Sequence, residues 1–186
     1  TGAALVAGSS LMMLRSQRAH AALAEKVIHK EQITVSEQLR KAVLESPRRP
    51  DADKKRDADR KPAETMAFFG IKPGMQVAEL MASRGYFTGV LAEAVGDSGT
   101  VYGQNNKWLR ERFKDGQRPL GDLITKGGDK NIVEQDTELE DLQLPRGKLD
   151  AIFMVMFYHD TYWLNINREA MNASVMAALK PGGMYG

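Results

Sequence analysis

Two groups of side chains in this sequence are of types, and at spacings, that suit ligand binding or chemistry. The first is Glu79, followed by the small-residue turn 82–85, and the second is the pair Tyr158 and His159. A tight turn of small residues lets the backbone approach a ligand closely, and a helix N-terminus beyond it offers unpaired N–H groups. An imidazole, with an ordinary pKa of about 6.5, can accept a proton from a nucleophile at neutral pH.

A strand and a helix are expected to position Glu79. Residues 75–81 form a short apolar run after Pro73 and Gly74, a pattern typical of a buried strand that follows a turn. Gly96 marks the expected end of a helix that begins near residue 86. The apolar face of this helix would be formed by Phe87, Val90, Leu91, Ala94 and Val95. The stretch is therefore predicted to be a strand, a tight turn and a helix.

A second predicted strand leads to Tyr158 and His159. It covers residues 149–157, the most apolar run of the chain, and is expected to be central and buried on both faces. Ligands of open α/β sheets bind beyond the carboxyl ends of the strands, which places both side chains where chemistry would occur. Asp160 is not expected to orient His159, because adjacent strand residues point to opposite faces. The alternative is that Tyr158 packs and His159 caps the strand.

The rest of the pattern alternates strands with helices, which predicts an α/β fold with a mostly parallel sheet between helices. Residues 114–130 are polar and rich in glycine, and they are expected to form a loop that is either a lid or merely mobile. The other predicted elements are strands at 100–103 and 131–133, helices at 107–113 and 167–179, and a fifth strand from Met184.

The N-terminal part of the chain divides into two predicted segments. Residues 1–22 contain an apolar stretch and a small-residue site at 19–21, typical of a secretory signal or, alternatively, of an amphipathic N-terminal helix. Residues 23–61 are predicted to be a helical, charged extension, in which Ser36 caps a helix. The alternating charges of 51–61 are typical of a solvated helical surface.

The main domain is predicted over residues 62–186. Pro62 is expected to begin its first helix, because proline suits the first helical position, and the buried residues of that helix would be Met66, Phe68 and Phe69. Gly70 is expected to end it.

Composition excludes several classes of function. The chain has 186 residues, 42% of them apolar, with a net charge of +2, a balance that does not favour a nucleic-acid surface. It contains no cysteine, which excludes disulfides, thiol nucleophiles and cysteine-ligated metals. Its three histidines lack the spacing of a metal site, and no apolar run is long enough to span a membrane. The oligomeric state is left open.

Several stretches together resemble one enzyme family. VAELMASRGYFT (77–88) resembles the first motif of class I S-adenosylmethionine-dependent methyltransferases, and LDAIFMVMFYHDTYW (149–163) and ALKPGG (178–183) resemble later strands. Residues 46–75 together with FYHDTYW are similar to a bacterial subgroup of predicted methyltransferases, in which an RDADRKP segment comes just before the core. The resemblance implies a Rossmann-like sheet lacking its C-terminal strands, S-adenosylmethionine as cofactor, and an unidentified, small-molecule methyl acceptor.

The resemblance also implies roles for individual residues. Glu79 would hold the methionine ammonium of the cofactor, Gln104 or Asn105 would hold its ribose, and His159 or Tyr158 would face the acceptor. The turn that carries the methionine part would include Met81, Ser83, Gly85, Tyr86 and Thr88. The adenine amino group would be approached by Asp136, with Glu134, Glu138 and Asp141 as competing choices. The charged segment 51–61 would cover the cofactor mouth.

Two departures from the family pattern leave a rival hypothesis open. The family usually carries glycine at the positions of Met81 and Ser83, and an acid where this chain has Gln104 and Asn105. The rival is an exported, non-catalytic binding domain that keeps the methyltransferase fold. Localisation follows the same alternative, periplasmic or exported if residues 1–21 are a signal segment and cytoplasmic otherwise.

Overall fold

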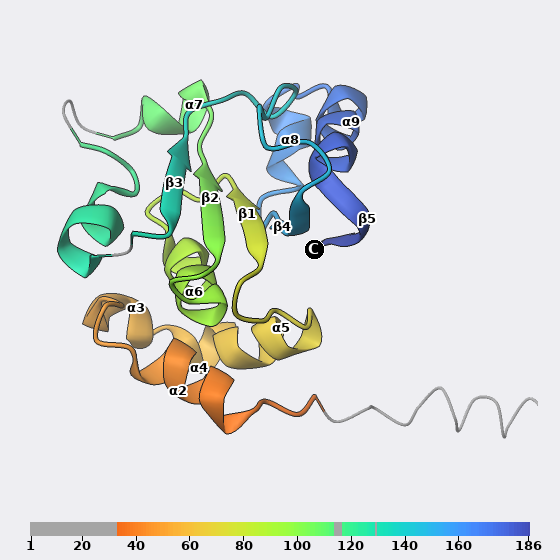
Figure 1. Ribbon diagram of the computed structural model, residues 1–186. Helices are drawn as coiled ribbons and strands as arrows, with labels where there is room; N and C mark the ends of the chain where they lie inside the picture. The colour runs from red at the N-terminus through yellow and green to blue at the C-terminus, as the bar shows by residue number, and fades with distance from the viewer. Residues whose placement is uncertain (1–32, 114–116, 129) are drawn as a thin grey trace, which may run out of the picture. The chain divides into compact units, whose positions relative to one another are not determined.

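A five-stranded, wholly parallel sheet forms the centre of the computed structural model, which describes residues 33–113, 117–128 and 130–186 (Figure 1). The strand order is β3-β2-β1-β4-β5, so the chain moves outward from β1 in one direction and then returns to the other side. This arrangement confirms the predicted α/β fold. The strands are β1 (Gln76–Leu80), β2 (Thr100–Gln104), β3 (Ile132–Gln135), β4 (Leu149–Phe153) and β5 (Leu179–Tyr185).

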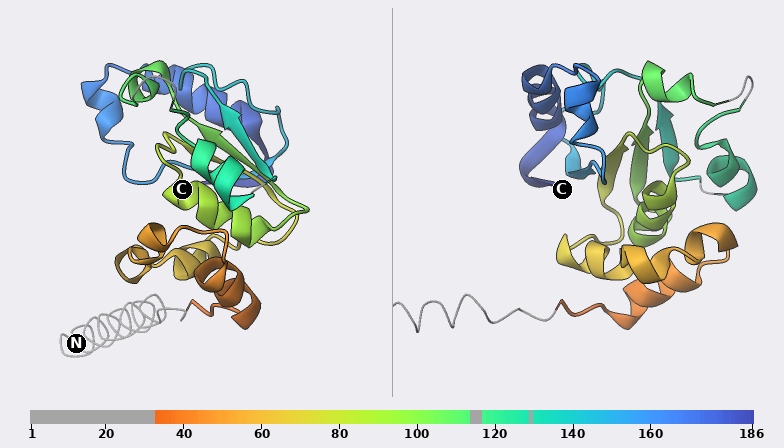
Figure 2. Two further views of the ribbon diagram at one scale, coloured as in Figure 1. Left: turned by 90° about the vertical axis from the view of Figure 1, so that its left-hand side faces the viewer. Right: turned by 180° about the vertical axis from the view of Figure 1, so that it is seen from behind.

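Helices cover both faces of the sheet. α6 and α9 lie on its opposite faces, as the edge-on view in Figure 2 shows. None of the described helices is both long and apolar enough to cross a membrane. They are α2 (Glu37–Glu45), α3 (Asp51–Lys54), α4 (Asp57–Arg60), α5 (Pro62–Phe68), α6 (Tyr86–Val95), α7 (Lys107–Arg110), the π-helical turn η1 (Leu123–Gly127), α8 (Asp160–Trp163) and α9 (Arg168–Ala178).

The alternation of side chains along β1 separates two hydrophobic cores. Val77 packs in the core that includes α6, whereas Ala78 and Leu80 pack in the core that includes α9. Because successive strand residues point to opposite faces, Glu79 shares the face of Val77 and meets α6. This register brings a carboxyl group into the interior next to the first turn of α6.

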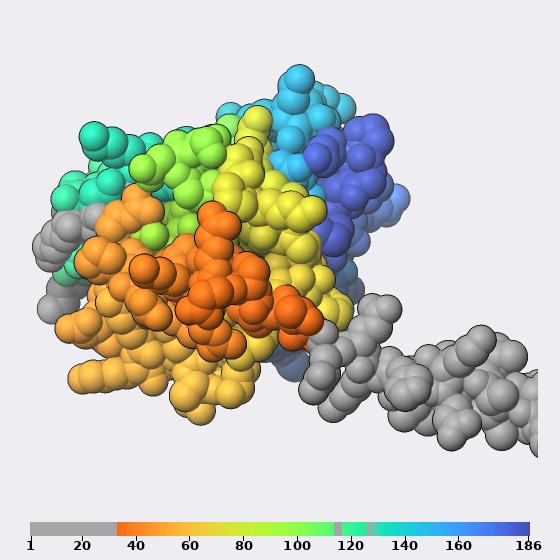
Figure 3. All heavy atoms as spheres, turned by 60° about the horizontal axis from the view of Figure 1, so that its bottom comes forward, coloured from red at the N-terminus to blue at the C-terminus, as the bar shows by residue number. Residues whose placement is uncertain are grey.

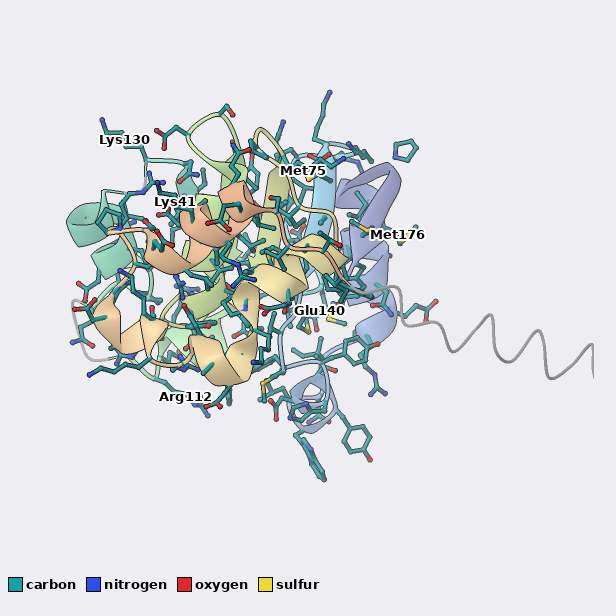
Figure 4. All side chains as sticks on the ribbon, turned by 90° about the horizontal axis from the view of Figure 1, so that it is seen from below. Lys41, Met75, Arg112, Lys130, Glu140 and Met176 are labelled. Carbon is teal, nitrogen blue, oxygen red and sulfur yellow. The ribbon has the colours of Figure 1, made fainter. Side chains whose placement is uncertain are left out.

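Helices α2 to α5 form a layer that packs on α6, and Lys41 on α2 lies on the outer side of this layer (Figures 3 and 4). The predicted cap is confirmed, since the Ser36 hydroxyl accepts a hydrogen bond from the Leu39 N–H at 3.2 Å. The predicted burial of α5 is correct for Met66 but wrong for Phe68, which is 67% exposed. Phe68 lies near the end of α5, where only one side of the helix faces the core.

The region around β4 and β5 differs from the sequence prediction. β4 ends at Phe153 rather than at residue 157, and the chain then turns into the short helix α8. β5 begins at Leu179, immediately after α9, instead of at Met184. The ammonium of Lys180, the second residue of β5, pairs with Asp150 of β4. A bulge in the pairing with β4 accommodates the following residues 181–183.

The segment predicted to be a loop, 114–130, is anchored to the core in its described part. Leu120 and Leu123 are buried, and residues 123–127 form the turn η1. Two leucines in an otherwise polar stretch carry too weak a periodic signal to predict this anchoring. The segment is therefore packed at Leu120 and Leu123 rather than being wholly a surface loop.

Candidate functional site

The turn after β1 keeps a glycine-like backbone without glycine at two of its three positions. Met81 and Ser83 have φ values of 56° and 55°, and Gly85, which precedes α6, has φ 84°. A left-handed conformation costs a residue with a side chain on the order of 1 kcal/mol or more, because its Cβ approaches the following carbonyl oxygen. The two positions where the sequence resemblance expected glycine thus retain the conformation that glycine would adopt.

Two buried amides at the end of β2 hold these strained residues in place. The Gln104 Oε1 accepts a hydrogen bond from the Met81 N–H at 3.1 Å, and the Asn105 Oδ1 accepts one from the Ser83 N–H at 2.8 Å. Gln104 also donates from Nε2 to the Thr137 carbonyl at 2.6 Å, and its side chain is 0% exposed. The oxygen and the nitrogen of the Gln104 amide are therefore both bonded to backbone groups, so Gln104 stabilises the turn rather than facing the cavity.

Gly85 is required by both conformation and space. A Cβ added there would lie 2.5 Å from Leu123 Cδ1 and 2.7 Å from Leu120 Cδ2, closer than packed atoms allow. The two leucines of the 117–128 segment therefore press directly on the turn. This contact explains why Gly85 remains when the other two positions carry side chains.

Glu79 is a buried carboxyl group at the base of this turn. It is 5% exposed, and its Oε2 accepts a hydrogen bond from the Thr88 hydroxyl at 2.5 Å. Burial raises the pKa of Glu79 to about 7, although the hydrogen bonds from Thr88 act in the opposite direction. Within the described ranges no lysine, arginine or histidine forms an ion pair with it. The carboxyl group can therefore accept a cation that a ligand brings.

A charged network joins the N-terminal extension to the start of α6. The Asp57 carboxylate accepts two hydrogen bonds from the buried Arg49, at 2.7 and 2.9 Å, and one from the Tyr86 hydroxyl at 2.7 Å. Burial alone would raise the pKa of Asp57, but these hydrogen bonds lower it below its ordinary value. The prediction that 51–61 forms a solvated surface is therefore wrong for Asp57, which connects that segment to Tyr86.

The turn and the extension line one cavity of about 440 Å³. Glu79 and Tyr86 contribute to its wall, together with the backbone of the turn, and Met156 closes it on the side of β4. The cavity opens at the carboxyl edge of the sheet, the position at which open α/β sheets bind ligands. The lining residues are Asp53, Arg56, Arg60, Glu79, Met81, Ala82, Ser83, Arg84, Gly85, Tyr86, Phe87, Val155 and Met156.

The cavity brings together five of the residues predicted for cofactor binding, namely Glu79, Met81, Ser83, Gly85 and Tyr86. Thr88 reaches it indirectly through its hydrogen bond to Glu79. Asn105 holds the turn from outside the cavity and is itself buried. Asp136 lies beyond the end of β3, half exposed, with its carboxylate 3.6 Å from the Arg110 guanidinium.

Tyr158 and His159 lie outside the cavity, in the segment between β4 and α8, and both are exposed. The prediction that these residues end a strand is wrong, since β4 ends at Phe153 and Asp160 begins α8. The His159 Nε2 is 3.4 Å from the Asp160 carboxylate, at the first residue of α8. The two side chains are 70% and 40% exposed, so this contact is open to water.

Sequence reasoning missed four residues around the cavity: Arg49, Arg56, Asp57 and Arg60. The guanidinium carbons of the three arginines lie 4.7 to 5.9 Å from the centre of the Tyr86 ring. Arg56, Asp57 and Arg60 belong to the charged segment 51–61, which the resemblance expected to cover the cofactor mouth, and Arg49 lies just before it. The periodicity of charges could not show which members face inward.

The fold is shared with solved methyltransferase structures. An S-adenosylmethionine-dependent methyltransferase from Aquifex aeolicus is similar with a TM-score of 0.55 and 23% identity, over 72% of this chain and 68% of that one. A protein-L-isoaspartate O-methyltransferase is similar with a TM-score of 0.57 and 20% identity, over 80% of this chain and 49% of that one. An S-adenosylmethionine-dependent O-methyltransferase from Thermotoga maritima is similar with a TM-score of 0.53 and 18% identity, over 73% of this chain and 49% of that one.

These likenesses confirm the fold that the sequence resemblance predicted, the Rossmann-like fold of S-adenosylmethionine-dependent methyltransferases. The chain spans between about half and two thirds of the length of the three structures. The sequence itself matches no protein-family model and no curated protein.

Proposed function

We propose that this protein is an S-adenosylmethionine-dependent methyltransferase that acts on a small-molecule acceptor. One observation carries the proposal: the left-handed turn at Met81, Ser83 and Gly85 borders the same cavity as the buried Glu79. Neither a strained turn nor a buried acid without a cationic partner stabilises a protein, and both cluster at functional sites. The shared fold supports the same reading.

The chemistry of this cavity fits the methionine part of the cofactor. Burying an acid without a cationic partner is unfavourable, and a ligand ammonium beside Glu79 would supply that partner. The backbone of the turn lines the cavity close by, where a ligand can reach it. Gln104 is a poorer fit to the ribose, because its amide is bonded to Met81 and Thr137.

Bound S-adenosylmethionine would supply a methyl group on a positively charged sulfur. The work left to the chain is to hold the acceptor atom close to that carbon and in line with the bond that breaks. Glu79 would fix the ammonium end, and Val155 and Met156 would shape the wall nearest to β4. His159, beside Asp160, would take up the acceptor proton where the acceptor has one to lose.

We infer that the acceptor is not a nucleic acid, since the net charge of +2 gives the chain no strongly basic surface. Whether the protein acts inside or outside the cytoplasm depends on residues 1–22, which lie outside the described residues. A signal segment there would favour the rival, an exported binding domain. The occupied amide of Gln104 is the structural feature that favours this rival.

Isothermal titration calorimetry with S-adenosylmethionine and S-adenosylhomocysteine tests the proposal. We expect both to bind, and the variant Glu79→Ala to bind about tenfold or more weakly, since a buried charge-assisted contact contributes roughly 1.5–3 kcal/mol. Asp97→Ala, a change at an exposed residue just after α6, is the matched control and should bind normally. No heat and no thermal shift at millimolar ligand would contradict the proposal and leave the binding-domain rival.

A further inference from the structure

Three arginines surround the candidate cofactor cavity. Arg56 and Arg60 come from the charged segment 51–61, and Arg84 comes from the turn after β1. The sequence places Arg56 and Arg60 one helical turn apart, a spacing that puts both on the same side of a helix. The extension and the domain core thus both contribute positive charge to the lining of one cavity.

In the described part of the chain, none of these three guanidinium groups forms an ion pair with a carboxylate. Arg56 lies over the Tyr86 ring at 4.7 Å, and Arg84 lies over the Phe113 ring at 5.1 Å. The Arg60 Nη1 donates to the Met156 sulfur at 2.8 Å, a weak acceptor. A ring face occupies a guanidinium without using its N–H groups, which therefore remain available to a ligand.

The acidic groups of the cavity do not balance this charge. Asp57 is committed to Arg49 and Tyr86, which leaves Asp53 and Glu79 as the acids that line the cavity. Burial raises the pKa of each, although Arg49 and Arg56 act against this at Asp53. The cofactor would not supply the missing negative charge, since its ammonium and sulfonium outnumber its one carboxylate.

We propose that the methyl acceptor carries an oxyanion, a carboxylate or a phosphate, and that Arg56, Arg60 and Arg84 bind it. Guanidinium groups are suited to this role because their planar fork of N–H donors matches the oxygens of both anions. The assignment to the acceptor rests on the proposed methyltransferase function. The anion site itself rests on the cavity and its three arginines alone.

The network beneath the arginines gives this site a fixed geometry. Tyr86, which supports Arg56 and Arg60, is held by its hydroxyl on Asp57, and Asp57 is held by the buried Arg49. A binding group whose support is already fixed loses less side-chain entropy when the ligand arrives. The segment 51–61 is therefore part of the site wall.

Inorganic phosphate is the first probe, because it needs no cofactor. We expect phosphate to raise the melting temperature of the wild-type protein and of Lys55→Gln, an exposed control between α3 and α4 outside the cavity lining. The double variant Arg56→Gln/Arg60→Gln and the single variant Arg84→Gln should bind phosphate about tenfold more weakly or worse. An equal response in all four proteins would overturn the proposal. Melting temperatures without phosphate show that each variant is folded.

A second titration distinguishes whether the arginines bind the anion of the acceptor or the carboxylate of the cofactor. Phosphate is titrated into protein saturated with S-adenosylhomocysteine, and an additive stabilisation is expected if the arginines serve the acceptor. Competition between the two ligands would mean that the arginines hold the carboxylate of the cofactor, and the acceptor assignment would fail. If S-adenosylhomocysteine does not bind while phosphate still binds through the arginines, the proposed function fails and the anion site stands.

Discussion

The turn after β1 and the segment after β4 share a strained backbone conformation but differ in burial. Each follows a buried strand of the same sheet, and each contains a methionine with φ 56°, Met81 in the first and Met156 in the second. Met81 is 6% exposed, with its N–H bonded to Gln104, whereas Met156 is 70% exposed. The same backbone strain is therefore enclosed at one strand end and open to solvent at the next.

The difference separates the two tasks of the proposed enzyme. The cofactor side is fixed by buried hydrogen bonds from β2 and by Leu120 and Leu123, so its shape is part of the folded core. The acceptor side, with Tyr158 and His159, makes few buried contacts, so side chains there can change without cost to the fold. Stability and S-adenosylhomocysteine binding should therefore respond strongly to changes on the first side and weakly to changes on the second.

The largest expected effect comes from Glu79→Gln and depends on pH. The folded pKa of Glu79 is about 7, above its ordinary value of 4.5, so its contribution to stability is complete below pH 4.5 and is lost as the pH rises through 7. The glutamine side chain cannot ionise, and the variant should gain on the order of 3 kcal/mol over wild type between pH 5 and pH 8. Urea unfolding at several pH values measures this.

The same substitution should weaken S-adenosylhomocysteine binding at pH 8, where wild-type Glu79 is ionised. The other polar groups near this acid are Thr88 on α6 and the residues that share its cavity. The charged ones among the latter are Asp53, Arg56, Arg60 and Arg84. Asp141→Asn, an exposed acid remote from the cavity, should show neither change. A Glu79→Gln difference that does not vary with pH would show that the acid is charged throughout.

The second effect tests whether the amides hold the cofactor turn. Gln104→Ala leaves the Met81 N–H and the Thr137 carbonyl without their partner, which should lower the free energy of unfolding by about 2 kcal/mol. Gln38→Ala, on the exposed side of α2, should change it by less than about 0.5 kcal/mol. Chemical denaturation measures the free energy of unfolding of both variants. Equal effects would mean that the Met81 turn does not depend on β2.

A smaller effect is expected where the strain itself is removed. Ser83→Gly should stabilise the protein by about 0.5–1 kcal/mol, because glycine adopts φ 55° without the steric cost that serine carries. Ser98→Gly, at a position with ordinary φ, should instead be neutral or slightly destabilising. Thermal melts of the two variants give the comparison. Destabilisation by Ser83→Gly would show that the serine side chain has a further role.

The smallest expected effect is on the acceptor side. His159→Ala should change the free energy of unfolding by less than about 0.5 kcal/mol and leave S-adenosylhomocysteine affinity unaltered, because the imidazole is 70% exposed. Its contact with Asp160 is also open to water and contributes little. A loss of more than about 1 kcal/mol in chemical denaturation would contradict the division between the two sides.

The fold and the cofactor side could be predicted because their signals are local. The apolar run before Glu79, the helical spacing after Tyr86 and the caps at Ser36 and Gly96 each depend on neighbours in the sequence. The resemblance added the order of these elements, and the five-stranded sheet agrees with it. Strand ends were less accurate, since the apolar run 149–157 continues past the last paired residue, Phe153.

The support of the site could not be predicted in this way. Arg49 lies eight positions before Asp57 but 37 before Tyr86, and their shared network forms only after the extension packs on α6. The resemblance implied that Gln104 or Asn105 would hold the ribose, yet tertiary packing gives the Gln104 amide two backbone partners. The leucines of the 114–130 segment were hidden by their polar neighbours.

The support of Met81 and Ser83 by Gln104 and Asn105 also bears on how such proteins are recognised. A search pattern that requires glycine at the first two turn positions rejects this chain, although the backbone there has glycine-like φ values. A pattern that pairs the absence of glycine after the first strand with a Gln-Asn dipeptide at the end of the second would accept it.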